Sequence, residues 1–515
     1  PWLGHATLTS ITALRRWDST GEADIDYSGA DIWYRPYGKN NNRVRFDTFS
    51  QELRLAGSAD RVDWMAGLYY DNEKLERRDA VTMGAAYEPY LSIAVLNDIA
   101  AAFPPGVVDT TGAATFMSEA AGMPYGTAFT GAASQDRWDQ DAKSTSAFGN
   151  ITFHATDKLA LTLGARYTHE SKSVDSFYSN PNDGLGCAAA LANPGQVGAA
   201  LAGRGVPGAY VGSIVPTVIG YMCLPWANPL FDGRTTTQDF TDNEWSGTAK
   251  ATYRWNESVM TYVSAARGYK AGGFNLDRVQ SANGLSDGPP GVVPVTDTSF
   301  PGEFVNSYEL GAKTNWQDGD LLLNAALFHS KYTDFQLNSF LGTSYVVRSI
   351  PELISKGLDA DLLWQTHVPG LSLQAGATYT DAKYGNDPLP DPALALVPGG
   401  TASFAPKWAL TGGVTYQWNF NSYLMGRFNL GAKYMTEYNT GSDLNPAKMQ
   451  PSYTLLNARM VVGAISKRWQ VELWGSNLTD RTYKQVGYDA PIQPGSYNAF
   501  LGAPRTYGLT LRASL

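Results

Sequence analysis

The side chains that could carry out chemistry are few and scattered along the chain. No two of the five histidines have the spacing of metal ligands: His5, His154, His169, His329 and His367. His169 stands beside Glu170, and such a pair could perform acid–base chemistry, but a polar wall or strand end explains it better. We therefore expect no catalytic site, no metal site and no cofactor.

Two further groups of residues could bind something. Asp359 and Asp361 share one face of a predicted strand, where we expect solvated carboxylates and keep a cation site as the alternative. Cys187 and Cys223 are the only two cysteines and fall in one predicted loop. An exported protein can keep such a pair oxidised, so we expect a disulfide, with two unpaired thiols as the alternative.

The composition favours a chain that meets lipid. Only 17% of the 515 residues are charged, while 52 are Gly and 29 are Tyr. A globular enzyme usually carries about 25% charged residues. The net charge of −9 argues against a nucleic-acid partner. The uncharged segment 205–231 holds Pro207, Pro216, Pro225 and Pro229, which would break a spanning helix, so we expect an apolar loop there.

Alternating hydropathy is the main structural signal. In residues 371–380, for example, Leu, Leu, Ala, Ala and Tyr alternate with Ser, Gln, Gly, Thr and Thr. One face of such a strand suits lipid and the other suits water. Roughly sixteen segments have this pattern, with centres near Ile11, Glu52, Leu68, Asn150, Leu163, Ala249, Val263, Leu310, Ala325, Ala360, Ala375, Gly413, Leu430, Ala458, Leu473 and Leu511.

The connections between these segments alternate between short and long. The short ones are 57–61, 155–158, 255–258, 317–320, 366–370, 419–422 and 465–468. The long ones are about 18–42, 79–141, 174–243, 270–301, 333–345, 384–406, 438–452 and 481–504. Short periplasmic turns and long extracellular loops are typical of outer-membrane barrels, whereas a soluble sandwich or propeller shows no such alternation.

The sequence therefore predicts an all-β fold, a transmembrane antiparallel β-barrel domain over residues 1–515. We expect it in the outer membrane of a Gram-negative bacterium, surrounded by outer-membrane lipid and lipopolysaccharide, with both ends of the chain on the periplasmic side. No secretory signal precedes Pro1, so we expect a mature or truncated form.

Several segments resemble the barrel of TonB-dependent receptors. In chain order they are Thr-Phe-Ser-Gln-Glu-Leu-Arg-Leu at 48–55, Asp-Trp-Met-Ala-Gly-Leu-Tyr-Tyr at 63–70, Arg-Gly-Tyr-Lys-Ala-Gly-Gly-Phe-Asn at 267–275, Tyr-Glu-Leu-Gly-Ala-Lys at 308–313, Ser-Lys-Gly-Leu-Asp at 355–359, Asn-Leu-Thr-Asp-Arg-Thr-Tyr at 477–483 and Gly-Ala-Pro-Arg-Thr-Tyr-Gly-Leu at 502–509. The resemblance covers essentially the whole chain.

The resemblance implies import of a scarce nutrient, such as a ferric siderophore, another bulky iron complex, a vitamin or a glycan. It also implies a 22-stranded barrel, an N-terminal plug and a box through which the TonB–ExbB–ExbD complex supplies energy. No plug or box precedes Pro1, so we expect the C-terminal part of a longer polypeptide. Leu515 departs from the aromatic residue that usually ends the family. A passive sixteen-stranded porin and a surface scaffold for protein partners are the alternatives.

The ligand should meet the long loops at the outer mouth. Residues 79–136 include no Lys, Arg or His, whereas a strongly anionic siderophore would favour cations there. We therefore expect a neutral, amphipathic or cationic cargo, with a ferric siderophore as the family's commonest case. The expected ligand contacts are the loop aromatics Tyr210, Tyr221, Trp226, Phe274, Tyr488 and Tyr497. The alternative is that such aromatics pack the loops against one another.

Overall fold

The computed structural model describes residues 6–181, 184–279, 293–340, 345–490 and 495–514. Pro1 and Leu515, on which two sequence-based expectations rest, lie outside these residues. Within them, one antiparallel sheet contains 18 strands, of which β2 (Ala23–Asp24) and β3 (Trp33–Arg35) are short. The remaining strands match the sixteen predicted segments, and each predicted centre lies in its own strand.

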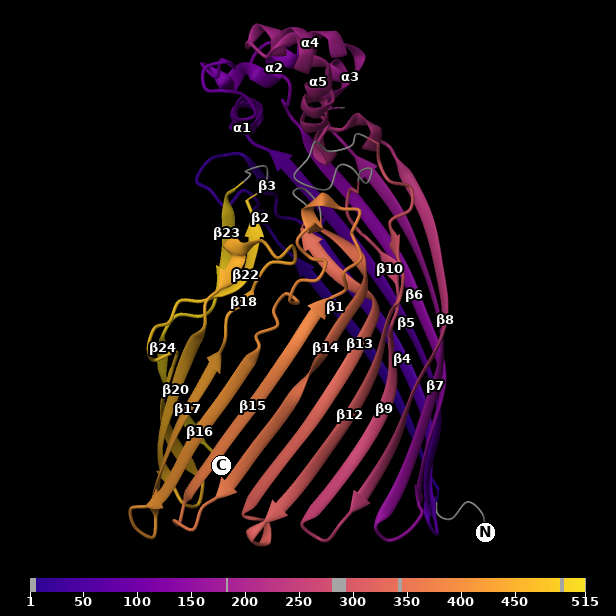
Figure 1. The fold of residues 1–515 in the computed structure, drawn as a ribbon, viewed down its shortest axis with the longest axis vertical. Coiled ribbons are helices and arrows are strands. Elements are labelled where there is room, and N and C mark those ends of the chain that lie inside the picture. The colour runs from indigo at the N-terminus through magenta and orange to yellow at the C-terminus, as the bar shows by residue number, and fades with distance from the viewer. Residues whose placement is uncertain (1–5, 182–183, 280–292, 341–344, 491–494, 515) are drawn as a thin grey trace.

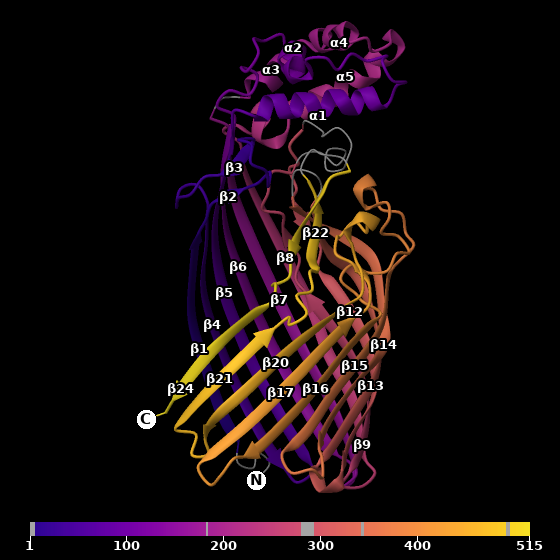
Figure 2. The same cartoon turned by 90° about the vertical axis from the view of Figure 1, so that its left-hand side faces the viewer.

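The long strands curl into a barrel wall (Figures 1 and 2). They are β1 (Thr7–Thr20), β4 (Arg43–Ala59), β5 (Val62–Met83), β6 (Ala133–His154), β7 (Leu159–Ser179), β8 (Thr235–Arg254), β9 (Val259–Lys270), β12 (Glu303–Trp316), β13 (Leu321–Phe340), β14 (Tyr345–Gln365), β15 (Leu371–Tyr384), β16 (Trp408–Asn419), β17 (Leu424–Met435), β20 (Tyr453–Ala464), β21 (Trp469–Ser476) and β24 (Thr506–Ala513). Each pairs with the next in this order. Among the described residues, no ladder joins β1 to β24.

The remaining short strands form hairpins within the long connections. They are β10 (Gly273–Phe274) with β11 (Ser299–Phe300), β18 (Tyr438–Asn439) with β19 (Met449–Gln450), and β22 (Lys484–Asp489) with β23 (Tyr497–Leu501). The single-turn helices are η1 (Ala113–Thr115), η2 (Pro225–Ala227), η3 (Pro229–Phe231), η5 (Gln317–Gly319), η6 (Pro392–Leu394) and η7 (Pro446–Lys448).

The two ends of the barrel differ, as predicted. All of the short turns lie at one end, where Thr7 of β1 pairs with Ala56 and Ala513 of β24 pairs with Trp469. All of the long connections lie at the other end (Figure 1). Both described ends of the chain therefore lie on the side of the short turns, which is the periplasmic side of an outer-membrane barrel.

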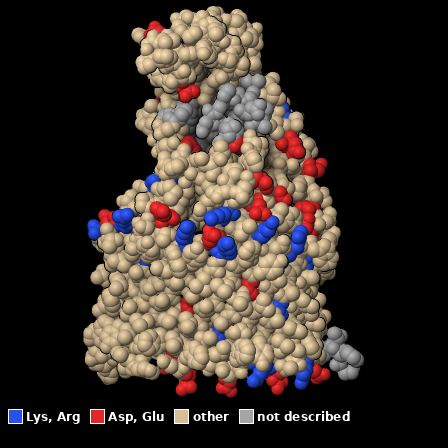
Figure 3. Space-filling view, viewed as in Figure 1, with Lys and Arg blue, Asp and Glu red and all other residues tan. Residues whose placement is uncertain are grey.

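The wall separates lipid-facing from lumen-facing side chains. On β7, Leu161 and Leu163 are exposed on the outer face, while Thr162 hydrogen-bonds Thr152 of β6 on the inner face. Figure 3 shows the outcome as a wide, largely uncharged band of wall between two belts of charged residues. Such a band is the surface that hydrocarbon requires.

Three of the long connections are shorter than predicted, because the strands that border them extend further. β13 and β14 border 341–344 rather than 333–345. The two longest connections differ in the same way. β5 continues to Met83 and β6 begins at Ala133, so the segment between them is 84–132 rather than 79–141. In the same way, β7 and β8 border 180–234 rather than 174–243. Ladder hydrogen bonds extend these strands, and one face of the extension is buried. Apolar Trp138 and polar Asp136 share that buried face, so hydropathy does not alternate there.

These two connections fold together into a helical cap above the barrel, which the sequence did not predict (Figure 1). Its helices are α1 (Tyr87–Ala101), α2 (Phe116–Ala121), α3 (Leu185–Ala192), α4 (Pro194–Gly203) and α5 (Gly208–Met222). Leu91 and Leu96 of α1, Phe116 of α2 and Leu201 of α4 are fully buried in one apolar core.

Helix α5 corrects the expectation of an apolar loop at 205–231. The helix includes Pro216, whose ring costs an interior hydrogen bond. Its C-terminal turn buries Val218 and Met222 in the cap core, and we attribute the survival of the helix to this burial. Among the described residues, no helix has both the length and the apolar character needed to cross a membrane.

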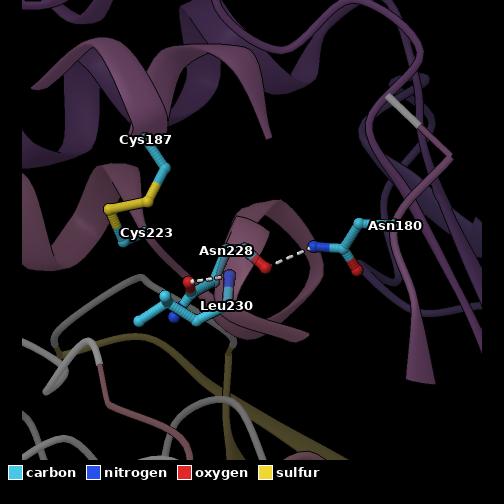
Figure 4. The surroundings of a disulfide bond; sticks show 5 residues. All are labelled: Asn180, Cys187, Cys223, Asn228 and Leu230. Atoms are coloured by element: carbon cyan, nitrogen blue, oxygen red, sulfur yellow. Dashed lines mark hydrogen bonds between the residues drawn. A yellow bond between two sulfur atoms is a disulfide. The ribbon is translucent and has the colours of Figure 1, made fainter. Parts of the chain in front are cut away.

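A disulfide joins Cys187 of α3 to Cys223, which directly follows α5 (Figure 4). Both cysteines are fully buried in the cap core. Below them, the side chain of Asn180 donates a hydrogen bond of 2.6 Å to the carbonyl of Asn228. The cap is thus linked covalently within one loop and by hydrogen bonds to the end of β7.

The lipid-facing wall generates a first prediction. Leu430 lies on the outer face in the middle of β17, and Asn429 beside it hydrogen-bonds Thr415 on the inner face. Leu430→Arg should lower the free energy of unfolding by about 2–4 kcal/mol, because it places a cation in hydrocarbon. Urea unfolding in lipid vesicles would measure this. Asn429→Arg, the matched control, should cost clearly less, and an equal loss for both variants would contradict the assigned faces.

The disulfide generates a second prediction. It closes a loop with a sequence separation of 36 residues, so replacing both cysteines by Ser should destabilise the cap by about 3–4 kcal/mol. Hydrogen exchange should then quicken in α3 and α5 while the amides of β12–β15 keep their protection. Unchanged exchange in the cap, or equal quickening in the barrel, would show that the disulfide does not serve the cap.

Candidate functional site

The inner wall of the barrel is polar and carries several acids. Asp71, Ser144, Glu170 and Asp242 lie side by side in one row across β5, β6, β7 and β8. Ser144 donates a hydrogen bond of 2.9 Å to Glu170, and Lys172 reaches the carbonyl of Gly272 at 2.6 Å. This part of the inner face is therefore lined by polar and charged side chains.

The residues considered for acid–base or cation chemistry hydrogen-bond to polar side chains of neighbouring strands. His169 contacts Asn243 at 2.8 Å, whereas Glu170 points to the opposite face of β7. Asp359 accepts from Thr378 at 2.7 Å and Asp361 accepts from Asn324 at 3.0 Å, each from a neighbouring strand. In the part of the chain that the structure describes, no three His, Cys, Asp or Glu side chains could hold a metal ion together.

The outer mouth carries an exposed aromatic patch, made by Tyr27, Tyr488 and Phe500. The ring of Tyr27, between β2 and β3, lies 5.4 Å from that of Tyr488 and 6.3 Å from that of Phe500, while the latter two are 5.3 Å apart. Tyr27 is 51% exposed and Phe500 is 52% exposed. The patch thus joins loops from opposite ends of the chain and leaves two rings open to a ligand.

The backbone at Tyr27 is unusual. Its φ of 56° lies in the left-handed region, which costs energy for a bulky residue. The side chain of Asp24 accepts a hydrogen bond of 3.2 Å from the amide of Tyr27 and holds the turn. This hydrogen bond supports the turn from which the Tyr27 ring reaches the neighbouring β22–β23 hairpin.

A buried lysine beside the patch holds the β22–β23 hairpin in place. Lys448 is 3% exposed at its side chain, and its ammonium lies 2.7 Å from Asp443 and 2.5 Å from Asp489. Its ammonium also lies 5.8 Å from the ring centre of Tyr497, whose hydroxyl accepts from Asn445 at 3.0 Å. Because Asp489 adjoins Tyr488, this cluster positions one ring of the patch.

A buried arginine holds the base of the cap. Arg278 makes two hydrogen bonds of 2.6 Å to Asp136 of β6, and the side chains of the pair are 5% and 4% exposed. Its guanidinium also donates to the carbonyls of Ser179 and Pro225 and to the side chain of Asn180. Burial raises the pKa of Asp136 to about 6, while the Arg278 charge opposes this, so the carboxylate is ionised at neutral pH.

The predicted ligand residues do not gather at one point. Tyr488 and Tyr497 share the β22–β23 hairpin. Tyr210 is 55% exposed on α5, where its ring packs against Phe103 at 5.4 Å. Tyr221 is half-buried at the other end of the same helix.

Two other predicted residues serve packing in this structure. Trp226 is 5% exposed, and its indole donates a hydrogen bond of 2.7 Å to the hydroxyl of Tyr87, whose pKa is raised by burial. Phe274 is buried against Trp138 and Phe231. The alternative that aromatics pack the loops together describes both residues. Ligand contact by any of the six stays a prediction.

Sequence reasoning missed Tyr27, Phe500, Lys448 and Arg278. Tyr27 and Phe500 are aromatic residues in predicted loops, so the criterion that selected the other loop aromatics also applies to them. Lys448 and Arg278 are isolated cations in sparsely charged loops, but their acceptors are distant in sequence. Asp136 and Arg278, for example, are 142 positions apart.

The cap base generates a third prediction. Arg278→Met should destabilise the protein by about 3–5 kcal/mol at pH 8, because Asp136 would be left buried, ionised and unpaired. Without the guanidinium the pKa of Asp136 should rise further, so the carboxyl would be neutral at pH 5 and the loss smaller there. Urea unfolding in detergent at both pH values would measure this.

The control is Arg505→Met, which removes an exposed pair with Asp480 at 3.9 Å and should cost at most about 1 kcal/mol at either pH. A loss for Arg278→Met that is larger at pH 5 than at pH 8 would contradict the assigned role of the ion pair.

Known proteins share both the sequence pattern and the fold of this chain. The pesticin receptor of Yersinia pestis is 22% identical over 477 residues, which cover 92% of this chain and 52% of the receptor. The crystal structure of the ferric yersiniabactin uptake receptor FyuA from Yersinia pestis superposes with a TM-score of 0.66 at 18% identity, covering 99% of this chain and 58% of that one. The siderophore receptor PiuA from Acinetobacter baumannii gives 0.60 at 16%, covering 98% and 61%.

The chain thus spans about half the length of the curated relatives that it matches. The model of the family "TonB dependent receptor-like, beta-barrel" matches residues 3–478, which is most of the described wall together with the cap. With the alternating strands, the polar lumen and the long outer loops already established, the chain belongs to the TonB-dependent receptor β-barrel family of the Gram-negative outer membrane.

Proposed function

We propose that the protein imports a scarce nutrient across the outer membrane as part of a TonB-dependent receptor, with a ferric siderophore or a comparable iron complex as its cargo. The observation that carries this proposal is the family match over residues 3–478. Among the similar proteins, FyuA is named a ferric yersiniabactin uptake receptor and PiuA a siderophore receptor. Energy would come from the TonB–ExbB–ExbD complex, and no catalytic step is needed.

The aromatic patch supports a cargo with a planar or apolar part. Tyr27 and Phe500 expose their rings at the mouth, and the Tyr488 ring contacts both of them. Aromatic stacking contributes about 0.5–1.5 kcal/mol for each ring pair. The ion pairs Lys448–Asp489 and Arg278–Asp136 hold the surrounding loops, so little ordering remains to be done when a ligand binds.

The cap favours the same class of cargo. Its described helices carry few charges, and Glu119 of α2 is paired with Arg204 at 2.7 Å. Figure 3 shows its surface as almost entirely uncharged on the side in view. A strongly anionic chelate would find few free cations there, so a neutral or amphipathic iron complex, vitamin or glycan fits the mouth better.

The fourth prediction tests this function. A deletion strain should lose growth on at least one ferric siderophore as its sole iron source, and the gene with its complete upstream region should restore it. Replacement of Tyr27, Tyr488 or Phe500 by Ala should weaken binding of that complex about two- to tenfold for each ring. Tyr423→Ala, which removes a 79% exposed ring near a periplasmic turn, is the matched control.

Normal growth of the deletion strain on every iron source, vitamin and glycan tested would refute the import proposal. If the intact gene restores growth but all three Ala variants bind the complex as tightly as the parent, the import proposal stands. The aromatic patch is then rejected as the contact site.

A further inference from the structure

The outer wall of the barrel contains a groove of about 620 Å³. It crosses β7, β8, β9, β12 and β13, and its outward-facing lining is almost wholly apolar. Ala249, Ala251 and Ala265 form its floor because their side chains are short. Leu163, Val263, Tyr308, Leu310 and Leu327 stand around them, each more than half exposed.

The strand registers show that the groove faces lipid. Ala265 of β9 pairs with Ala249 on one side and with Tyr308 on the other, and Val263 pairs with Ala251 and Leu310. Paired residues of neighbouring strands point to the same face, so these side chains share the outer surface. A groove that is flanked by exposed aliphatic side chains at this depth suits a hydrocarbon chain.

A polar row lies directly above the groove, one outward-facing position further along each strand. Asn306 of β12 pairs with Arg267 on one side and with Lys331 on the other, and all three follow the outward alternation. The two cations are therefore about 10 Å apart at the backbone, which is two strand spacings. Long Arg and Lys side chains could both reach one phosphate group across this gap.

The row lies at the height where lipid headgroups begin. Between Val259, where β9 starts, and Arg267, a rise of about 3.3 Å per residue at about 45° tilt gives roughly 19 Å. The apolar band of such barrels is about 25 Å tall. Arg267 is thus near the outer border, and Figure 3 shows a belt of charged residues above the uncharged wall.

The two cations keep capacity for an anion. Arg267 is 48% exposed, stacks over Phe304 at 4.9 Å and has Glu244 only at 3.7 Å. Lys331 is 50% exposed and pairs with Glu352 at 2.6 Å. An ammonium has three donors, and an exposed pair of this kind contributes little, so a phosphate could share or replace the carboxylate.

The ladder between β8 and β9 ends at Arg267. Its last pair joins Gly247 to Arg267, whereas the β7–β8 ladder continues upward to Thr235. Arg267 donates instead to the carbonyl of Trp245 at 3.3 Å, where the next rung would be.

We propose that this surface binds one phosphate-bearing lipid of the outer leaflet, with an acyl chain in the groove and a phosphate between Arg267 and Lys331. The combination of an acyl-sized apolar groove with a cationic row in register above it carries the assignment. The proposal concerns the outer wall alone, so it does not depend on the cargo of the receptor.

The fifth prediction tests this site with the full chain in detergent. Native mass spectrometry should detect one diphosphoryl lipid A bound to the delipidated protein after titration. Ala265→Phe, which fills the groove, should abolish that complex. Arg267→Gln and Lys331→Gln should weaken it about fivefold each, since a cation near an anionic headgroup contributes about 1 kcal/mol. Lipid A stripped of both phosphates should bind the parent protein as weakly as the double Gln variant binds diphosphoryl lipid A.

Two matched controls keep the result specific. Ala377→Phe enlarges an outward alanine of β15, and Lys143→Gln removes an outward, 52% exposed cation of β6; neither residue lines the groove. Both should bind lipid A like the parent. The proposal is overturned if the parent binds no lipid A, if the controls lose it equally, or if the double Gln variant retains full affinity. The Gln variants decide the question alone should Ala265→Phe fail to fold.

Discussion

The whole structure depends on one constraint, which is that peptide groups in hydrocarbon must find hydrogen-bond partners within the protein. Strand pairing from β1 to β24 satisfies it for successive strands, because each long strand pairs with the next one along the chain. Because paired residues share a face, the same ladders sort the side chains. Leu163 meets lipid and Thr162 meets the lumen only while the register holds, since a slip of one residue would exchange them.

Above the membrane, peptide groups no longer need partners within the protein, and the chain forms the helical cap. Water can hydrogen-bond to peptide groups there, so the backbone need not form strand ladders. The connections between β5 and β6 and between β7 and β8 instead form helices around a separate apolar core. The Cys187–Cys223 disulfide stabilises this core further, because it restricts the conformations of the unfolded loop. Buried ion pairs fix the remaining loops, with Arg278 beneath the cap and Lys448 beside the β22–β23 hairpin.

The barrel could be predicted well because its signal is local. Alternation identified each long strand, and the lengths of the connections oriented the wall, since both follow from neighbours in sequence. The helices of the cap escaped prediction for the opposite reason. Helix α5 includes Pro216, and its N-terminal residues are not buried, so its own sequence does not favour a helix. The helix is stabilised by the burial of Val218 and Met222 in the cap core, which depends on distant residues. The strands that lead to the cap likewise continue beyond the point where hydropathy stops alternating.

The sequence by itself determined the β-barrel and its orientation, because two-residue alternation and the lengths of the connections are local properties of the chain. It also indicated the family, through the resemblance of segments such as 48–55 and 477–483. Only the tertiary structure decided which loop residues meet. It brought Tyr27 to Tyr488, Asp136 to Arg278, and Arg267 into one row with Lys331, and it buried Trp226, which its residue type alone placed among the ligand contacts. These contacts join positions far apart along the chain, and their geometry depends on the register and curvature of the whole wall.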